Sequence, residues 1–286
     1  MAELWVVATP IGNLNDLTPR MREALEKCDL IAAEDTRVTM KLLSKLDVRK
    51  PMVSSHRHNE VQRADGLIDK MLREDMTVAL VCDAGTPGIS DPGSPVVRAA
   101  IEAGIRVVPI CGPCAAVAAI SASGFDAREF AFYGFLPREK KPLREKLEKI
   151  SNGDVRVAVF YESPHRVVDL VEMISEVSPE CMLSVACDIS KLYEKIDTGT
   201  CEEVLARLRA NENVEKGEYC VVCAFPEREE AEEALNTAAS VEARMVELLL
   251  AGLSVRQASE TLMEQGVSRN DAYRAKLRLS RLFGEE

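Results

Sequence analysis

Short apolar runs alternate with amphipathic stretches through the first 120 residues of this 286-residue chain. The apolar runs have the length of buried strands, and the stretches between them repeat their apolar positions at helical spacing. The predicted strands are 4–8, 30–33, 52–55, 77–82 and 106–110. The predicted helices are 18–28, 36–46, 59–73, 94–103 and 113–123. Because apolar strands that alternate with helices pair in parallel, we expect a mostly parallel sheet covered by helices.

The same alternation starts again after residue 126. Further strands are predicted at 130–135, 155–161, 183–186 and 219–225, and further helices at 166–177 and 201–210. We therefore expect a first α/β domain over residues 1–123 and a second α/β domain over residues 127–226.

A small helical region is expected at 237–286, after an acidic linker. Its three short helical patterns are 241–251, 254–265 and 269–282. Short helices with tight turns resemble a DNA-reading helix-turn-helix, yet residues 241–283 carry seven basic and five acidic side chains. This near balance favours a packing or RNA-contacting bundle, so no DNA partner is expected.

Composition narrows the class of protein. No stretch approaches the ~20 consecutive apolar residues of a membrane span, and the first residues lack the basic segment of a signal peptide. Nine cysteines, an odd number, are scattered mostly within apolar runs. This is typical of reduced cytosolic thiols rather than of a disulfide framework. We expect a cytoplasmic protein that has no membrane partner.

The charge distribution leaves RNA binding open. The net charge of −11 argues against nonspecific binding to nucleic acid, which requires neutralised phosphates. Two segments are nevertheless basic, at residues 37–58 and 138–149. Such runs are usually solvated helix faces, although they can also form a local basic surface.

Loops rich in glycine and proline follow three predicted strands of the first domain, at 9–14, 84–93 and 111–115. Residues 34–37 and, in the second domain, residues 162–166 also follow strands. The carboxyl ends of parallel strands meet at one edge of a sheet, and ligands bind there. We therefore expect the two domains to face each other across a cleft lined by these loops.

The longest of these loops matches no common nucleotide fingerprint. No strand is followed by G-x-G-x-x-G, and residues 88–94 have the glycine spacing of a phosphate-binding loop without its lysine. Asp91 in this loop would repel phosphates. A positively charged cofactor held mainly by backbone groups is therefore expected.

A dithiol motif offers an alternative chemistry. Cys111 and Cys114 form a C-G-P-C sequence between a strand and a helix, as in thioredoxin-like oxidoreductases. However, Ile110 stands where that family commonly has tryptophan, and the chain is much longer than one such domain. An incidental cysteine pair beside a Gly-Pro turn is the favoured interpretation.

No metal site is expected. Cys220 and Cys223 are three residues apart in a predicted strand, so their side chains point to opposite faces. His56, His58 and Glu60 supply too few ligands for a closed site.

Seven motifs together resemble one family. They are VVATPIGNLNDLTPR (6–20), DLIAAEDTR (29–37), HNE (58–60), ALVCDAGTPGISDPG (79–93), FYGFLPR (132–138), FYESPHR (160–166) and SKLYE (190–194). On these motifs the chain resembles the methyltransferases that modify the ribose 2′-oxygen of a cytidine in the decoding region of 16S rRNA, within the tetrapyrrole methylase superfamily. The resemblance implies an α/β, two-domain tetrapyrrole-methylase-like fold, with S-adenosyl-L-methionine bound in the interdomain cleft. It also implies a homodimer in the bacterial cytoplasm that acts on 16S rRNA within the small ribosomal subunit.

By matching motif, the resemblance assigns cofactor contacts to backbone and small side chains of several loops. These residues are Pro10, Gly12, Asp83, Gly85, Thr86, Pro87, Ile89, Ser90, Cys114, Ala115, Tyr161 and Ser163. The chain departs from the family pattern at Cys111 and Cys114, where Pro and Ser are common, and at residues 187–189, where Arg-Glu-Leu is usual. The first departure removes a hydroxyl at position 114, and the second removes a cation.

Methylation of a ribose hydroxyl requires a group that accepts or orients its proton. We expect Asp35 and Glu162 in this role with His165 behind them, and strand-end capping is the alternative for each. Arg37 and Arg166 are candidates for holding phosphates, although an ion pair between Asp35 and Arg37 is the alternative there. The expected RNA-binding residues are Arg37, Arg57, Arg138, Lys140, Lys141 and Arg166.

Two other functions compete with RNA methylation. A small-molecule methyltransferase that uses S-adenosylmethionine on tetrapyrroles would share the fold, but the motifs EDTR, HNE and YESPHR belong to the RNA-acting branch. A noncatalytic binding module fits less well, because so many of the cleft loops are intact.

Overall fold

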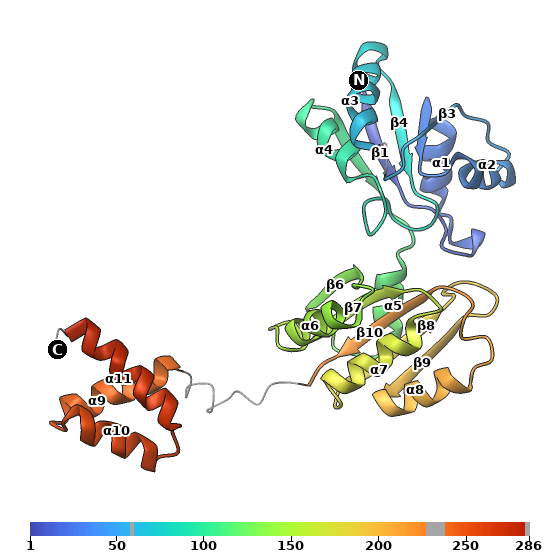
Figure 1. Ribbon diagram of the computed structural model, residues 1–286. Helices are drawn as coiled ribbons and strands as arrows, with labels where there is room; N and C mark the ends of the chain where they lie inside the picture. Colours follow the sequence, from blue (N-terminus) through green and yellow to red (C-terminus); the bar gives the residue numbers. More distant parts are fainter. Residues whose placement is uncertain (58–59, 227–237, 284–286) are drawn as a thin grey trace. The chain divides into compact units, whose positions relative to one another are not determined.

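The structure is a computed structural model that describes residues 1–57, 60–226 and 238–283. The chain divides into two compact units, residues 1–226 and residues 227–286. Figure 1 labels most of the helices and strands.

The larger unit begins with a five-stranded sheet in the order β3-β2-β4-β1-β5 (Figure 1). Its strands are β1 (Glu3–Val7), β2 (Leu30–Ala33), β3 (Met52–Ser54), β4 (Thr77–Val81) and β5 (Arg106–Ile110). Every pairing in this sheet is parallel, which confirms the prediction from the alternating pattern.

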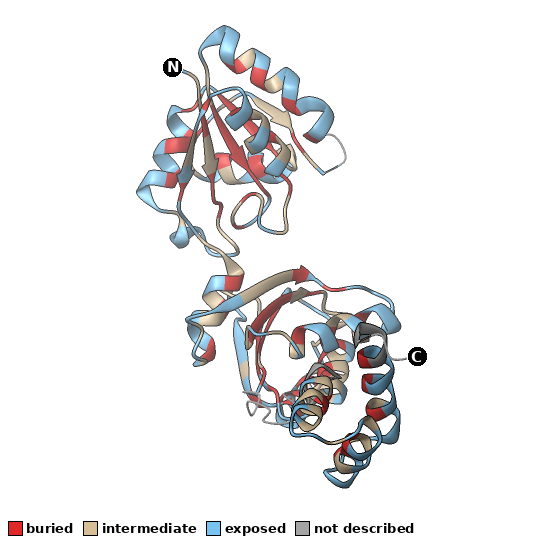
Figure 2. Ribbon diagram, turned by 90° about the vertical axis from the view of Figure 1, so that its left-hand side faces the viewer, coloured by how far each residue is buried: buried red, intermediate tan, exposed pale blue. Residues whose placement is uncertain are grey.

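Helices cover both faces of this sheet. They are α1 (Pro19–Lys27), α2 (Thr36–Lys45), α3 (Glu60–Glu74) and α4 (Ser94–Glu102). Successive side chains of a strand point to opposite faces. Ile31 accordingly packs with α1 and α2, whereas Leu30 packs with α3 and α4. The inner strands β2 and β4 are buried between the two helical layers, as Figure 2 shows, and the edge strands β3 and β5 are partly exposed.

The second sheet of this unit is mixed, in the order β6-β7-β10-β8-β9. Its strands are β6 (Phe130–Phe135), β7 (Val157–Glu162), β8 (Met182–Cys187), β9 (Lys195–Thr200) and β10 (Tyr219–Ala224). β6 and β7 are parallel, and the other neighbours are antiparallel. Strand β9 lies at an edge and was not predicted from the sequence.

The second sheet is also covered on both faces. Helices α6 (Lys140–Ser151), α7 (Val167–Val177) and α8 (Cys201–Ala210) pack on one face. Helix α5 (Ala115–Ser123) packs on the other face, where Ala116 and Ala119 contact the cluster of Val159 and Val222. Although α5 directly follows β5 of the first sheet, its core contacts are therefore with the second.

The described part of the smaller unit, residues 238–283, forms three helices, α9 (Ala238–Leu250), α10 (Val255–Glu264) and α11 (Arg269–Phe283). Met245, Leu262 and Ala275, one from each helix, are buried together in its core. Ser254 starts α10, because its side chain accepts a hydrogen bond from the backbone N–H of Gln257. Among the described residues of both units, no helix combines the length and the apolar character that crossing a membrane would require.

Candidate active site

The loops that follow β1, β4, β5 and β7 enclose a cavity of about 500 Å³. Residues of both sheets line it, as the positions of the strand ends predict. Its size is within the range of ~300–1,000 Å³ that is usual for small-molecule sites.

Hydrogen bonds join the first three of these loops. Thr9 N–H donates to the Gly85 carbonyl (2.8 Å), and Gly85 N–H donates to the Thr9 carbonyl (3.0 Å). Thr86 Oγ1 donates to the Pro113 carbonyl in the loop after β5 (3.1 Å). β1 and β4 are neighbours whose following helices lie on opposite faces, and α/β sheets bind ligands at such a position.

The loop after β4, residues 82–93, is held by the segment that leads into α3. Arg57 Nη2 donates to the Ser90 carbonyl (2.9 Å). The buried Glu60 carboxylate accepts the backbone N–H of Gly93 through Oε2 (2.6 Å). Gly93 has a φ of 135°, and a Cβ there would lie 3.2 Å from a methyl group of Leu80. Side chains of residues 57 and 60 therefore fix both the tip and the end of this loop.

The tip of the same loop touches the second sheet. Ser90 has a φ of 65°, and its Oγ would lie 2.5 Å from a Cβ added at Gly134. Gly134 itself has a φ of 61°, at the register shift between β6 and β7. Glycine is therefore required at this point of contact, for its backbone conformation and for lack of space.

Three carboxylates line the cavity on the side of the first sheet: Glu34, Asp83 and Asp91. Burial raises the pKa of each, and the neighbouring negative charges raise the pKa of Glu34 further. Asp83 N–H donates to Glu34 Oε2 (3.3 Å), which keeps two of them adjacent. Partly buried like charges of this kind favour a cationic ligand.

Asp35 does not line the cavity and is engaged elsewhere. Its Oδ1 accepts the backbone N–H of Arg37 (2.8 Å), which caps α2. Its Oδ2 lies 2.6 Å from Arg37 Nη2. These hydrogen bonds to Arg37 lower the Asp35 pKa to about 2. The capping and ion-pair alternatives are thus both realised, and Asp35 is a weak base.

Glu162 ends β7 and lies in the cavity wall, where its residue is only 2% exposed. Oε1 accepts the backbone N–H of Ser163 (2.7 Å). Oε2 has no hydrogen bond among the described residues, and Arg166 Nη2 lies 3.4 Å from it. Arg166 also donates to the Pro137 carbonyl (2.9 Å). The sequence places Glu162 here because the strand runs directly into the loop that lines the cavity.

Aromatic rings form part of the wall on the side of the second sheet. Tyr161 packs edge-on against Phe132 (ring centroids 4.9 Å apart) and Phe135 (5.8 Å). Its hydroxyl accepts the backbone N–H of Ala116 (3.2 Å) in the first turn of α5, and burial raises its pKa. Phe135 remains 62% exposed, so a planar ligand group could stack on it.

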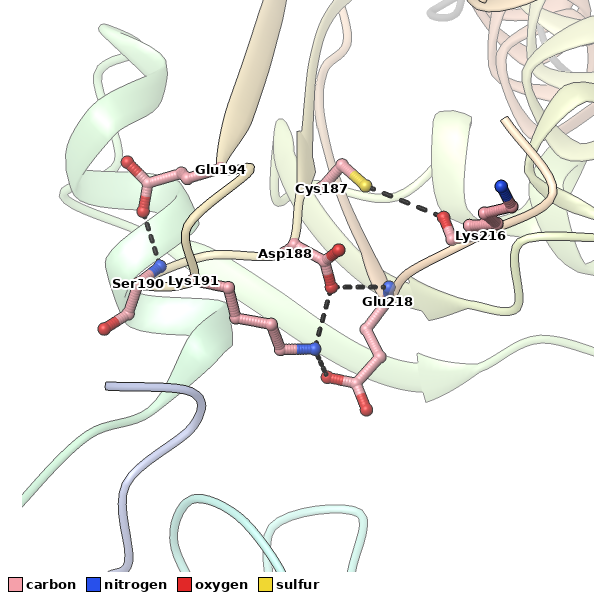
Figure 3. A network of polar contacts seen from close by, with 7 residues as sticks. All are labelled: Cys187, Asp188, Ser190, Lys191, Glu194, Lys216 and Glu218. Atoms are coloured by element: carbon pink, nitrogen blue, oxygen red, sulfur yellow. Dashed lines mark hydrogen bonds and ion pairs between the residues drawn. The ribbon is translucent and has the colours of Figure 1, made fainter. Parts of the chain in front are cut away.

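An ion-pair network supports the remaining wall, between the end of β8 and the start of β10 (Figure 3). Asp188 Oδ1 accepts Lys191 Nζ (2.7 Å) and the backbone N–H of Glu218 (3.2 Å). Lys191 Nζ also donates to Glu218 Oε2 (2.8 Å). The stem of Lys191 lies so close to Gly12 that a Cβ at Gly12 would clash with it. This network joins the β1 loop to the second sheet.

Comparison with known proteins identifies the family. Residues 3–205 match the family model described as Tetrapyrrole (Corrin/Porphyrin) Methylases. The chain belongs to the tetrapyrrole methylase family. Relatives named "Ribosomal RNA small subunit methyltransferase I" resemble this methylase along almost its whole length. The Escherichia coli relative is 42% identical over 95% of this chain and 93% of its own. The Synechocystis sp. relative is 40% identical over 98% of this chain and 99% of its own.

Solved structures confirm the fold of this methylase. A uroporphyrin-III-C-methyltransferase from Thermus thermophilus has a TM-score of 0.52 and 21% identity, covering 78% of this chain and 94% of its own. The methyltransferase CobJ has a TM-score of 0.57 and 18% identity, covering 79% and 95%. A further structure, of a uroporphyrin-III C-methyl transferase from Thermus thermophilus, is complexed with S-adenyl homocysteine. It has a TM-score of 0.54 and 14% identity, covering 78% of this chain and 97% of its own.

Most of the residues expected at the site of the methylase line the cavity. They are Asp83, Gly85, Thr86, Ile89, Ser90, Cys114, Ala115, Tyr161, Glu162 and Ser163. Pro10, Gly12 and Pro87 do not line it, whereas Ile11 between the first two does. His165 lies outside the lining and is exposed, with Nδ1 3.9 Å from Glu215 Oε2.

Several lining residues of the methylase were not among the site residues named from the sequence. They are Ile11, Glu34, Ala84, Asp91, Phe135, Pro164, Ile189, Gly217, Glu218, Tyr219 and Cys220. Of these, Ile11, Glu34, Ala84, Asp91 and Pro164 lie in loops that were expected to line the cleft, and the charge of Asp91 already favoured a positively charged cofactor. Ile189 and Glu218 come from loops without a glycine–proline pattern, and the sequence offered no such signal for them.

The basic residues expected to bind RNA lie outside the cavity lining. Arg138, Lys140 and Lys141 are exposed at the start of α6. Arg37 is 85% exposed at its side chain, and the Arg57 head group is used in the contact with Ser90.

All nine cysteines of the methylase are free, and six of them are buried. Cys114 starts α5, so the C-G-P-C sequence lies before the helix rather than within its first turn. Within residues 1–57, 60–226 and 238–283, no cluster of three or more His, Cys, Asp or Glu side chains could hold a metal ion.

Proposed function

We propose that this methylase transfers the methyl group of S-adenosylmethionine to the ribose 2′-hydroxyl of a cytidine in 16S rRNA of the small ribosomal subunit. The names of relatives about 40% identical over nearly the full chain support an rRNA substrate. The observation that carries the proposal is the acidic cavity where the loops of both sheets meet.

The cavity suits a cationic methyl donor. Glu34, Asp83 and Asp91 supply negative charge without a basic side chain among the lining residues. Backbone groups of the loops after β4 and β5 would hold the polar parts of the donor, and Phe135 offers a face for a planar ring. When bound, S-adenosylmethionine supplies a methyl group that is activated by its positively charged sulfur.

Glu162 is our candidate for accepting or orienting the proton of the ribose hydroxyl. It lies in the cavity wall, and its Oε2 has no hydrogen bond within the described chain. Arg166, 3.4 Å away, balances its charge. Asp35 and His165 are less suitable, because Asp35 is paired with Arg37 and neither residue lines the cavity.

We assign phosphate binding to the exposed basic segments at 37–50 and 138–149. Charge reversal at Lys140 and Lys141 should weaken binding to small subunits and reduce its salt dependence, because each lost phosphate contact lowers the salt slope by about 0.7–0.9. Unchanged affinity would place the RNA surface elsewhere.

A transfer assay tests the function and separates it from its alternative. The purified protein is incubated with methyl-labelled S-adenosylmethionine and either small ribosomal subunits or uroporphyrinogen. We expect label in the 16S rRNA, resistant to alkaline cleavage at one cytidine. Label in the porphyrinogen alone would establish the small-molecule function instead.

We further propose that the protein acts as a homodimer in the cytoplasm. The division between its α/β domains, which the sequence put between residues 123 and 127, we place instead before α5, because α5 packs on the second sheet. Light scattering of the purified protein should give twice the mass of the 31.5 kDa chain.

A further inference from the structure

A second cavity, of about 330 Å³, lies between β3 and α3 of the larger unit. Its inner surface is apolar and comes from Leu30, Val53, Leu67 and Val96. None of the residues that line it also lines the active-site cavity. It is therefore a separate site.

The rim of this second cavity is cationic. Arg63 and Lys70 of α3 line it, and no acidic residue does, although the whole chain has a net charge of −11. Arg63 Nη1 donates to the Ser54 carbonyl (3.2 Å), which holds the guanidinium at the rim. Lys70 forms no ion pair with any described residue. These charges suit an anionic group.

The unpaired hydroxyl of Ser55 is a second indication of a ligand, which does not depend on charge. The residue is 4% exposed, and its backbone N–H donates to the Ala33 carbonyl (2.7 Å). The residue lines the cavity, and its Oγ is buried without a hydrogen-bond partner in the described chain. Buried hydroxyls are normally hydrogen-bonded, so this one is available to a polar ligand atom.

Gly66 keeps the cavity open. It lies in the middle of α3, and a Cβ added there would meet no atom within 4 Å. Glycine disfavours a helix interior relative to alanine, and neither crowding nor a left-handed backbone requires it here. The missing side chain instead leaves room at the cavity lining.

From these observations we infer that the second cavity binds one nucleotide unit of the RNA substrate. Arg63 and Lys70 contact its phosphate, the apolar inner surface covers its base, and Ser55 hydrogen-bonds to a polar atom of the base or ribose. The chemistry is that of a nucleoside monophosphate, and the assignment to RNA rather than to a free nucleotide rests on the proposed function.

A direct binding measurement tests the site without any methyl transfer. The full-length protein is titrated with cytidine 5′-monophosphate and, separately, with inorganic phosphate, while backbone amide resonances are followed by NMR. We expect saturable shifts at residues 53–55 and 62–70 with the nucleotide, and their loss in Gly66→Leu, which fills the open space. Equal affinity for inorganic phosphate, or unchanged nucleotide binding by Gly66→Leu, would overturn the inference.

Binding to small ribosomal subunits distinguishes RNA from a free nucleotide. Arg63→Glu/Lys70→Glu is compared with Arg73→Glu/Arg98→Glu, which makes the same change in net charge on α3 and α4 outside the cavity lining. We expect the first pair to bind subunits at least tenfold more weakly than the second, with a smaller salt slope. Equal affinities of the two pairs would refute RNA binding at this cavity.

Calorimetry with S-adenosylmethionine distinguishes a failure of the second-cavity inference from a failure of the proposed function. Both charge variants should bind the donor like the parent protein, because no substituted residue lines the active-site cavity. If the parent protein itself failed to bind the donor, the proposed function would fail, while the nucleotide titration would still decide the second cavity.

Discussion

At the scale of single residues, the carboxylates that line the active-site cavity and Asp35, which does not line it, have pKa values shifted in opposite directions. Glu34, Asp83 and Asp91 have pKa values raised by burial, whereas hydrogen bonds to Arg37 lower the pKa of Asp35 to about 2. Acidic groups with raised pKa values are typical of functional sites, and Asp35 is typical of a structural cap.

Neutralising Asp91 should have opposite effects on stability and on donor binding. Its folded-state pKa is raised, so the folded state binds the proton more tightly than the unfolded state. This contribution makes the donor-free protein less stable as pH rises from the unfolded value of ~3.9 through the folded value. We therefore expect the stability of Asp91→Asn, measured by thermal unfolding between pH 4 and pH 8, to fall less with rising pH than that of the parent protein.

The same variant should bind S-adenosylmethionine about tenfold more weakly, a change of about 1.4 kcal/mol. In the parent protein, affinity should fall as pH decreases through the raised pKa, because protonation removes the charge that attracts the cation. Calorimetry at several pH values measures both effects. Tight, pH-independent binding by Asp91→Asn would show that this carboxylate does not face the donor.

Replacing Glu162 should affect chemistry more than binding. A positioned proton acceptor contributes roughly 10²–10⁴-fold to a rate, so Glu162→Gln should lower kcat by a factor in that range. The amide keeps the shape of the side chain, and the donor Kd should change less than threefold. His165→Ala is the control, because His165 lies outside the cavity lining. A Glu162→Gln enzyme with the parent kcat would exclude this role.

At the scale of elements, the position of the loop after β4 depends on the start of helix α3. The loop after β4 is fixed by Arg57 and Glu60, so the start of α3 determines where the cavity-lining residues of this loop lie. Gly93 cannot carry a side chain without strain at its φ of 135°.

Removing the Glu60 carboxylate should loosen this loop. A hydrogen bond to a charged group contributes about 1.5–3 kcal/mol, so Glu60→Ala should lower stability by an amount in that range. Hydrogen exchange should increase at residues 84–93 and donor affinity should fall. Glu60→Gln, which retains an acceptor oxygen, should recover part of both. Unaltered exchange in Glu60→Ala would show that other contacts fix the loop.

A strand could be predicted from the sequence when its own residues are apolar, and could not when its extended form depends on pairing with another strand. The inner strands β2 and β4 of the first sheet are buried on both faces and have apolar sequences, so their positions could be found directly. Strand β9 has the sequence KIDTGT and is largely exposed at a sheet edge. Its extended form follows from pairing with β8, which the local pattern does not contain.

The residues of the active-site cavity likewise fall into those that the sequence predicted and those that it did not. The loops at 84–93 and 111–115 could be assigned to one sheet edge because they end apolar strands. The individual residues at 83–90 and 114–115 were predicted from the resemblance to the family. Ile189 and Glu218 reach the cavity from segments that were not expected to line it, and their place becomes clear only once both sheets are assembled. Likewise, the ion pair between Asp35 and Arg37 could be foreseen from spacing, but not chosen over a catalytic role.

At the scale of the whole molecule, each unit has its own core. Met245, Leu262 and Ala275 form a cluster with other residues of α9–α11, and the clusters of residues 1–226 are made from that segment alone. The cavity residues all belong to the larger unit.

A chain that ends at Pro226 should therefore fold and bind the donor. We expect one cooperative unfolding transition by circular dichroism and a Kd for S-adenosylmethionine within about twofold of the full-length value. Affinity for small subunits, measured in parallel, reports whether α9–α11 contact RNA. A truncated protein that is unfolded, or that has lost the donor, would show that the units depend on each other.

Helix α5 has a consequence for how the larger unit can move. It follows the first sheet in sequence and packs on the second, so residues 111–114 form a short covalent hinge between them. Any rotation of one sheet against the other must change backbone torsions at this hinge, whose last residue, Cys114, lines the cavity. Occupancy of the cavity and the angle between the sheets are thermodynamically linked, and the bound molecule stabilises whichever angle binds it best.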